Sequence, residues 1–127
     1  MKKRVLLVED HAASREMMLD WLTLEGYEAQ AASDLDSARA ALLQGVPDAV
    51  LLDVGLGAQN GLDLPAWMRQ RAELAGVPII AVTAFAMVTD RDFIFTAGCD
   101  DSIPKPVDFS QLRSRLARWL RALKEAF

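Results

Sequence analysis

The stretch Ala49-Val50-Leu51-Leu52-Asp53 consists of four apolar residues followed by an acid. Two other stretches have the same form, because Val5 to Val8 precedes Glu9-Asp10 and Ile79 to Val82 precedes Thr83. Unbroken apolar runs of this length are typical of strands that are covered on both faces, as in a parallel sheet. The weaker strand candidates are Tyr27 to Ala31 and Asp101 to Ile103.

Helical patterns of apolar residues fall between the predicted strands. The expected helices include Met17 to Leu22, Ser33 to about Gly45, one with a pattern from Leu64 to Arg71 that Gly76 and Pro78 end, Thr89 to Ala97 and Asp108 to Leu123. In the second helix, Ser33 and Asp36 have the spacing of a capping box. Alternating strands and helices predict an α/β fold: a doubly wound, five-stranded parallel sheet flanked by five helices, with right-handed crossovers.

The composition limits the class of protein. The 127 residues have room for one domain, so residues 1–127 are expected to fold together. Hydrophobic residues make up 52% of the chain and the formal net charge is −4, which favours a globular domain and argues against nucleic acid as a partner. No apolar stretch approaches the ~18–20 residues of a membrane span. One cysteine, Cys99, and one histidine, His11, exclude a disulfide framework and a cysteine- or histidine-rich metal site.

Polar residues gather where the predicted strands end. Ligands of open parallel sheets bind outside the carboxyl ends of the strands, and these ends carry Glu9, Asp10, Asp53, Thr83 and Lys105. Three neighbouring carboxylates repel one another unless a cation joins them, and oxygen ligands suit a hard divalent ion such as Mg²⁺. A lysine and a hydroxyl facing that ion would hold an anion. A phosphoryl group between metal and lysine is the expected occupant.

The order of these residues also matches a known pattern. Glu9-Asp10, Asp53, Thr83-Ala84 and Lys105-Pro106 each follow a predicted strand. From Val5 to about Leu123 the chain resembles the receiver domain of two-component response regulators, in the variants seen in single-domain regulators and hybrid kinases. The resemblance implies the flavodoxin-like receiver fold and a signalling domain that is not an enzyme, apart from promoting its own phosphorylation and the hydrolysis of its acyl phosphate.

The resemblance assigns the nucleophile and the metal ligands. Asp53 would be the phosphoacceptor, whose carboxylate attacks the phosphorus of a phosphohistidine. Asp10 and Asp53 would ligate Mg²⁺ together with the backbone carbonyl of Gly55, and Glu9 would act through a metal-bound water.

The resemblance also assigns the groups that would hold the phosphoryl oxygens. Thr83 would donate its hydroxyl and Lys105 would supply positive charge, while the amides of Gly55 and Ala84 would add hydrogen bonds. A cis peptide between Lys105 and Pro106 is expected to aim the lysine into the site, because cis bonds are essentially confined to proline.

Three positions need a separate interpretation. The position three residues before the lysine usually carries Tyr or Phe in this family, and here it is Ser102, so the usual aromatic switch lacks its ring. Gly57 stands where the family often has proline and is expected to loosen its loop. The run Phe93-Ile94-Phe95 covers more of a helix circumference than an inward stripe does. We therefore expect Phe93 to face outward and to be available to a partner.

The implied setting is cytoplasmic signalling. The phosphoryl group would come from a histidine kinase or a histidine phosphotransfer protein, and output would be contact with a downstream protein. No nucleic acid or membrane partner is expected, and the resemblance also allows a homodimer through the fourth and fifth helices. The alternative is a phosphorylation-independent interaction module that keeps the site, which Ser102 favours. A flavodoxin-like cofactor binder is a more remote alternative, because the acidic site would repel a cofactor phosphate.

Overall fold

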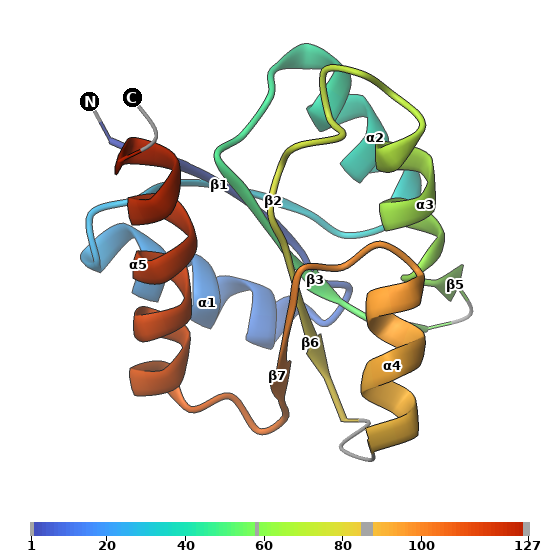
Figure 1. The fold of residues 1–127 in the computed structure, drawn as a ribbon. Coiled ribbons are helices and arrows are strands. Elements are labelled where there is room, and N and C mark those ends of the chain that lie inside the picture. Colours follow the sequence, from blue (N-terminus) through green and yellow to red (C-terminus); the bar gives the residue numbers. More distant parts are fainter. Residues whose placement is uncertain (1, 58, 85–87, 126–127) are drawn as a thin grey trace.

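The computed structural model describes residues 2–57, 59–84 and 88–125, with side chains described except at 88–90 and 121–125. The five predicted strands are present, within a residue of their expected ends: β1 (Arg4–Val8), β2 (Glu28–Ala32), β3 (Ala49–Asp53), β6 (Ile79–Thr83) and β7 (Asp101–Pro104). They form a parallel sheet in the order β2-β1-β3-β6-β7 (Figure 1). The strand order reverses between β1 and β3, which is where ligands of such sheets bind.

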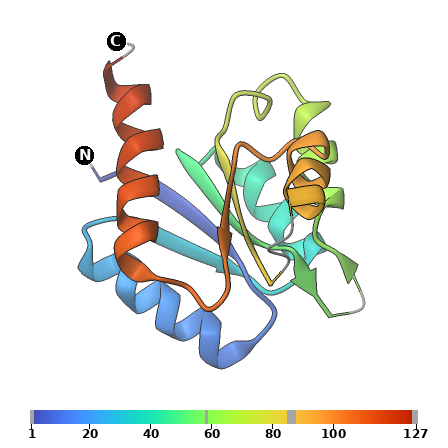
Figure 2. The ribbon, with the colours of Figure 1, turned by 60° about the horizontal axis from the view of Figure 1, so that its bottom comes forward.

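Five helices cover the sheet: α1 (Ala12–Leu24), α2 (Leu35–Gln44), α3 (Asp63–Arg69), α4 (Val88–Thr96) and α5 (Phe109–Glu125). Helices α1 and α5 lie on one face, and α2, α3 and α4 lie on the other (Figures 1 and 2). The doubly wound α/β architecture is therefore confirmed. Residues 85–87, which connect β6 to α4, lie outside the described residues.

The apolar runs of the strands supply both halves of the core. Leu7 and Leu51 pack with α1 and α5, whereas their neighbours Val8 and Leu52 pack with the three helices of the other face. All four side chains are 2% exposed or less. Successive strand residues point to opposite faces, so a strand that is covered on both sides has no position for a polar residue until it ends.

The start of α2 corrects one prediction. Asp34, not Ser33, caps the helix, and its Oδ1 accepts a hydrogen bond of 2.7 Å from the Ser37 amide. The Ser37 hydroxyl in turn accepts a hydrogen bond of 3.2 Å from the Asp34 amide. The predicted box at Ser33 and Asp36 is one residue early, because two overlapping pairs of polar residues have the same spacing.

The end of α3 also differs from the prediction, since the helix stops at Arg69, before the end of its apolar pattern at Arg71 and well before Gly76. The guanidinium of Arg69 donates to the carbonyl oxygens of Ala75 and Val77, both at 2.9 Å, and to that of Gly98 at 2.8 Å. It also pairs with Asp100 at 2.7 Å. These bonds satisfy carbonyl groups of the loop after α3 and of the turn after α4, so Arg69 ties the two segments together.

Helix α5 is attached to the edge strand β7 by a charged group. Asp101 is 7% exposed, and its carboxylate accepts hydrogen bonds from the Arg115 guanidinium and from the Trp119 indole, the latter at 2.9 Å. At the other end of α5, the Phe109 ring lies 5.1 Å from that of Trp21 on α1. These contacts join α1, α5 and β7 on one side of the sheet.

A small hairpin, which the sequence analysis did not predict, follows Asp53. Its strands are β4 (Gly55–Leu56) and β5 (Gln59–Asn60). The Gln59 side chain accepts a hydrogen bond of 3.1 Å from the Leu35 amide, which ties the hairpin to α2. Gly57 has a φ of +59°, and an added Cβ would lie 3.3 Å from an Asp10 carboxylate oxygen. The structure thus explains the glycine at position 57 by its left-handed backbone conformation and its closeness to the Asp10 carboxylate, rather than by loosening of the loop.

Gly61 provides a test of how closely this region is packed. An added Cβ would lie 2.7 Å from the Val54 carbonyl oxygen and 2.8 Å from that of Asp53. We expect Gly61→Ala to lower the free energy of unfolding by about 1–3 kcal/mol, as overpacking does. Gly76→Ala is the control, since no atom lies within 4 Å of its added Cβ, and its effect should stay within about 0.5 kcal/mol. Denaturant titration measures both, and equal effects would contradict the packing described here.

Candidate functional site

Strand register brings the acidic residues together. Val8 pairs with Leu52, and Asp53 pairs with Val82, so β1, β3 and β6 end side by side. Glu9 and Asp10 follow β1 directly. Carboxylate oxygens of Glu9, Asp10 and Asp53 all lie within 4.8 Å of one another. We call these three residues the acidic cluster.

Lys105, the residue that follows β7, contacts the acidic cluster. The Lys105–Pro106 peptide bond is cis, as expected, and the Lys105 amide donates a 2.8 Å hydrogen bond to the Thr83 carbonyl oxygen. The Lys105 Nζ lies 2.9 Å from Asp53 Oδ1, which also accepts a 3.0 Å hydrogen bond from the Gly55 amide. One oxygen of Asp53 is therefore held by an ammonium and an amide, and both stabilise its negative charge.

Burial raises the electrostatic energy of the cluster. Glu9 and Asp53 are 4% and 5% exposed, whereas Asp10 is exposed. Burial, and then a hydrogen bond to Asp53 and the charge of Asp53, raise the pKa of Glu9 from 4.5 to about 7. The two buried carboxylates, Glu9 and Asp53, therefore repel each other less when one of them holds a proton. A divalent cation would remove the need for that proton, and the three oxygen donors fit Mg²⁺.

The remaining phosphoryl-binding candidates lie at the same edge of the sheet. Thr83 is the last residue of β6 and is 2% exposed, and Ala84 follows it on the surface. Gly55 lies two residues after Asp53 with its amide on the Asp53 carboxylate. The structure therefore brings these positions to the end of the sheet where the acidic cluster lies.

Arg15 supports the acidic cluster and was missed by the sequence analysis. Its guanidinium donates 3.1 Å hydrogen bonds to the carbonyl oxygens of both Glu9 and Asp10. His11, in the same loop, caps α1 through a 3.4 Å contact from the Ser14 amide to its Nδ1. An arginine in the first turn of the helix that follows an acidic pair is the signal that would have identified this support.

Two other predicted positions lie outside the acidic cluster. Ser102 is half-buried on β7 between Asp101 and Ile103, which are buried on the α5 side, so it projects toward the α4 side. Phe93 is 66% exposed while its neighbour Ile94 is 1% exposed. The outward orientation expected of Phe93 is confirmed.

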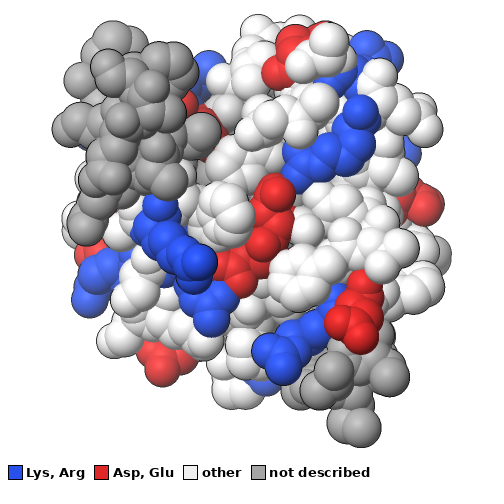
Figure 3. Space-filling view, viewed as in Figure 1, with Lys and Arg blue, Asp and Glu red and all other residues white. Residues whose placement is uncertain are grey.

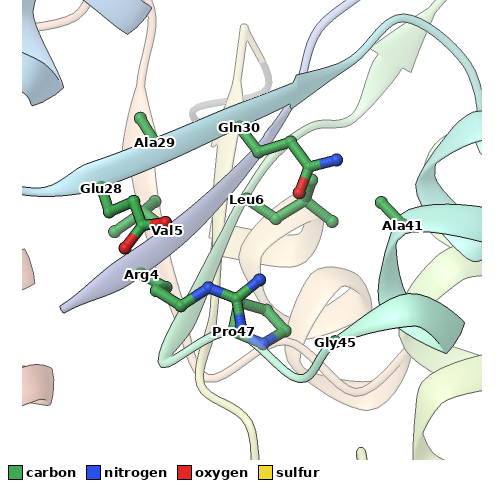
Figure 4. Close-up of a pocket in the computed structure, with 9 residues that line it drawn as sticks. All are labelled: Arg4, Val5, Leu6, Glu28, Ala29, Gln30, Ala41, Gly45 and Pro47. Atoms are coloured by element: carbon green, nitrogen blue, oxygen red, sulfur yellow. The ribbon is translucent and has the colours of Figure 1, made fainter.

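Hollows elsewhere on the surface are less suited to chemistry. One of about 60 Å³ lies at the amino ends of β1 and β2, between Arg4, Glu28 and the loop after α2 (Figure 4). It is smaller than the pocket beside the acidic cluster and lies at the opposite end of these strands. On the face seen in Figure 3, several basic side chains lie together on the α5 side, and acidic side chains lie next to them.

The comparisons with known proteins agree with the fold. The chain belongs to the response regulator receiver domain family, whose sequence profile matches residues 5–117. It is 33% identical over 124 residues to the polar-differentiation response regulator DivK of Brucella ovis, covering 94% of this chain and 98% of that protein. The family is one of signalling domains.

Solved structures show the same similarity. The receiver domain of the sensor histidine kinase PA1611 from Pseudomonas aeruginosa has a TM-score of 0.86 and 30% identity, with 94% of this chain and 98% of that chain covered. That structure holds a magnesium ion in its active site cleft. A CheY-like receiver domain protein from Methanospirillum hungatei has a TM-score of 0.89 and 26% identity, with both chains covered completely.

None of the helices in the described part of this chain is long and apolar enough to cross a membrane.

The raised pKa of Glu9 gives a pH dependence for the metal-free protein. Folded Glu9 binds a proton that the unfolded chain has lost above about pH 4.5, so stability falls as the pH rises from 4.5 to about 7. We expect unfolding titrations in EDTA to show this loss, and Glu9→Gln to reduce it. Mg²⁺ should restore stability at pH 7.5. A Glu9→Gln protein with the same pH profile as the wild type would contradict the assignment.

Proposed function

We propose that this chain, over residues 1–127, is a phosphoacceptor signalling domain that receives a phosphoryl group on Asp53. The observation that carries the proposal is the environment of this carboxylate. It is buried beside two other acids, yet one of its oxygens is bound by Lys105 and by the Gly55 amide. Membership of the receiver family supports the same role.

Asp53 would act as the nucleophile. One carboxylate oxygen forms a bond to the phosphorus of a phosphohistidine while the phosphorus–nitrogen bond breaks, and the imidazole leaves with the electron pair. The product is an acyl phosphate on Asp53. The chemistry needs positioning and charge neutralisation more than acid–base catalysis, because an anion must approach an anion.

Four groups of this chain would hold the transferred phosphoryl oxygens. The Lys105 ammonium already lies at the Asp53 carboxylate and would follow the charge onto the phosphoryl group. The Thr83 hydroxyl would donate a hydrogen bond from the end of β6, and the amides of Gly55 and Ala84 would add two more. Thr83 and Lys105 are joined through their backbones, so the two groups keep a fixed relation.

Mg²⁺ is the proposed cofactor, because the acidic cluster offers hard oxygen ligands and an excess of negative charge. Asp10, Asp53 and the Gly55 carbonyl would hold the ion, and Glu9 would act through a water. When bound, Mg²⁺ supplies the positive charge that offsets the repulsion between carboxylates and phosphoryl oxygens. The magnesium ion in the cleft of the PA1611 receiver domain supports this assignment.

The proposed partners follow from the family. The donor would be a histidine kinase or a histidine phosphotransfer protein of the cytoplasm. Output would be contact with a downstream protein rather than nucleic acid, in keeping with the net charge of −4 and the mixed surface of Figure 3. Instead of a downstream protein, the partner could be a second copy of the chain, in a homodimer through α4 and α5.

Phe93 is the proposed centre of the output surface. A groove of about 290 Å³ has walls from the hairpin after Asp53, including Gly55 and Asn60, and from Phe93 and Ile94 of α4. The residue next to the proposed phosphoryl site thus shares a surface with an exposed aromatic ring. Because Ser102 has no ring to move, this groove would connect the surroundings of Asp53 to a partner.

An interaction module that does not respond to phosphorylation is the second candidate function. It is favoured by Ser102, which is half-buried on the α4 side and too small to fill or vacate an aromatic slot. The two functions differ in one measurement. Phosphorylation changes the affinity for the output partner in the first case and leaves it unchanged in the second.

The nucleophile is tested with Asp53→Asn. We expect the wild type to gain the mass of one phosphoryl group when it is incubated with Mg²⁺ and acetyl phosphate, and the variant to gain none, because the amide keeps the shape but lacks the nucleophilic charge. Intact mass measures both. Asp20→Asn, an exposed acid on α1, is the control and should label like the wild type. Full labelling of Asp53→Asn would show that another residue is the acceptor.

The output surface is tested with Phe93→Ala. We expect weaker partner binding or self-association, with a change in unfolding free energy below about 1 kcal/mol because the ring is exposed. Leu43→Ala, an exposed apolar residue on α2, should leave association unchanged. Ile94→Ala should instead cost about 2–5 kcal/mol, as a core truncation does. Association that is unaffected by Phe93→Ala would remove this ring from the output surface.

A further inference from the structure

A pocket of about 260 Å³ opens beside the acidic cluster, between α1 and the chain that follows β7. We call it the side pocket. Its apolar walls come from both elements: Met17, Met18, Pro106, Val107 and Phe109. Asp53, Glu9 and Lys105 line its polar end. The side pocket is therefore continuous with the proposed phosphoryl site but is mostly apolar.

The walls of the side pocket are part of a fixed framework. Phe109 packs against Trp21, and Met18 is 4% exposed in the core under α1. Met17 is 54% exposed, at the mouth of the pocket. Repacking these side chains would disturb the core between α1 and α5, so the hollow is not readily closed by small movements.

The size of the side pocket sets the size of a ligand. An apolar cavity of roughly 150 Å³ is enough for benzene. The side pocket is larger, so it has room for a six-membered ring with a carbonyl group attached. An acetyl group carries one methyl and would leave most of the apolar wall uncovered.

The charges of the side pocket define the chemical class of that ligand. The only cation among the residues that line it is Lys105, whose Nζ lies 2.9 Å from Asp53 Oδ1. A matching ligand has an anionic group at one end and an uncharged apolar group directly attached to it. A nucleotide does not match, since its sugar and further phosphates would meet methionine, valine and phenylalanine side chains.

We propose that the side pocket binds the apolar acyl group of small acyl phosphates, so that this domain takes phosphate from aromatic or branched acyl donors in preference to acetyl phosphate. This inference rests on the proposed function of Asp53. An Asp53 carboxylate oxygen bonds to phosphorus, and the bond between phosphorus and the acyl oxygen breaks. The acid leaves as a carboxylate with the electron pair, and no proton or redox partner is needed.

The first experiment compares benzoyl phosphate with acetyl phosphate as donors, in the presence of Mg²⁺. The rate of labelling is followed by intact mass for the wild type and Met17→Gln. Because the two donors differ in intrinsic reactivity, the decisive quantity is the change in their rate ratio between the two proteins. Each methylene-sized group that is buried strengthens binding by about fourfold. We therefore expect Met17→Gln to lower the ratio of the benzoyl phosphate rate to the acetyl phosphate rate by about fivefold or more. Leu24→Gln, on the exposed side of α1 outside the pocket, should keep the wild-type ratio.

The second experiment measures binding without phosphoryl transfer. Benzylphosphonate, which cannot transfer its phosphoryl group, should shift the methyl resonances of Met17 and Met18, and methylphosphonate at the same concentration should not. Met17→Gln should weaken the binding of benzylphosphonate, seen at Met18. This readout stays valid if Asp53 is not a phosphoacceptor.

The outcomes separate the inference from the proposed function. Labelling by neither donor would overturn the proposed function, and the benzylphosphonate shifts would then decide the side pocket alone. Labelling with the same rate ratio in wild type and Met17→Gln would overturn the side pocket inference and leave Asp53 as acceptor. Absence of benzylphosphonate binding would also overturn it.

Discussion

Repulsion among three carboxylates is the constraint on which the functional edge of this sheet depends. Glu9, Asp10 and Asp53 approach within 4.8 Å because three parallel strands end at the same level. Their neighbours each reduce the cost of that approach. Lys105 and the Gly55 amide bind one oxygen of Asp53, and the raised pKa of Glu9 allows it to keep a proton. The edge is therefore arranged for the arrival of positive charge and is less stable without it.

Two ion pairs away from this edge hold helices against the sheet. Arg69 binds Asp100 and three backbone carbonyls, and Arg115 binds Asp101 within the fold. Removing one partner of such a pair is costly, because it leaves an uncompensated charge in a partly buried place. These pairs fix α3 and α5 to the sheet. The domain thus combines a framework of paired charges with one edge that carries an excess of negative charge, and that edge is where the chemistry is proposed.

The strands and the acidic cluster could be predicted from sequence because both depend on neighbouring residues. An apolar run such as Val50 to Leu52 is a local signal, and the acid that ends it falls at the sheet edge whatever the rest of the chain does. The cap at Asp34 was misplaced by one residue because two polar pairs compete locally. The contacts of Arg69 with Gly98 and Asp100, and those of Asp101 with α5, were missed because these partners are 14 to 31 residues away, and no local pattern records such contacts.

The three tryptophans of the chain stand in three different surroundings. Trp21 lies against an aromatic ring between α1 and α5, whereas Trp67 on α3 has the guanidinium groups of Arg39 and Arg71 at 5.8 and 4.6 Å from its ring. Trp119 donates its indole proton to the carboxylate of Asp101. Emission from each ring is therefore sensitive to a different part of the molecule. A set of single-tryptophan proteins would resolve, by fluorescence alone, which side of the sheet rearranges first when the domain unfolds.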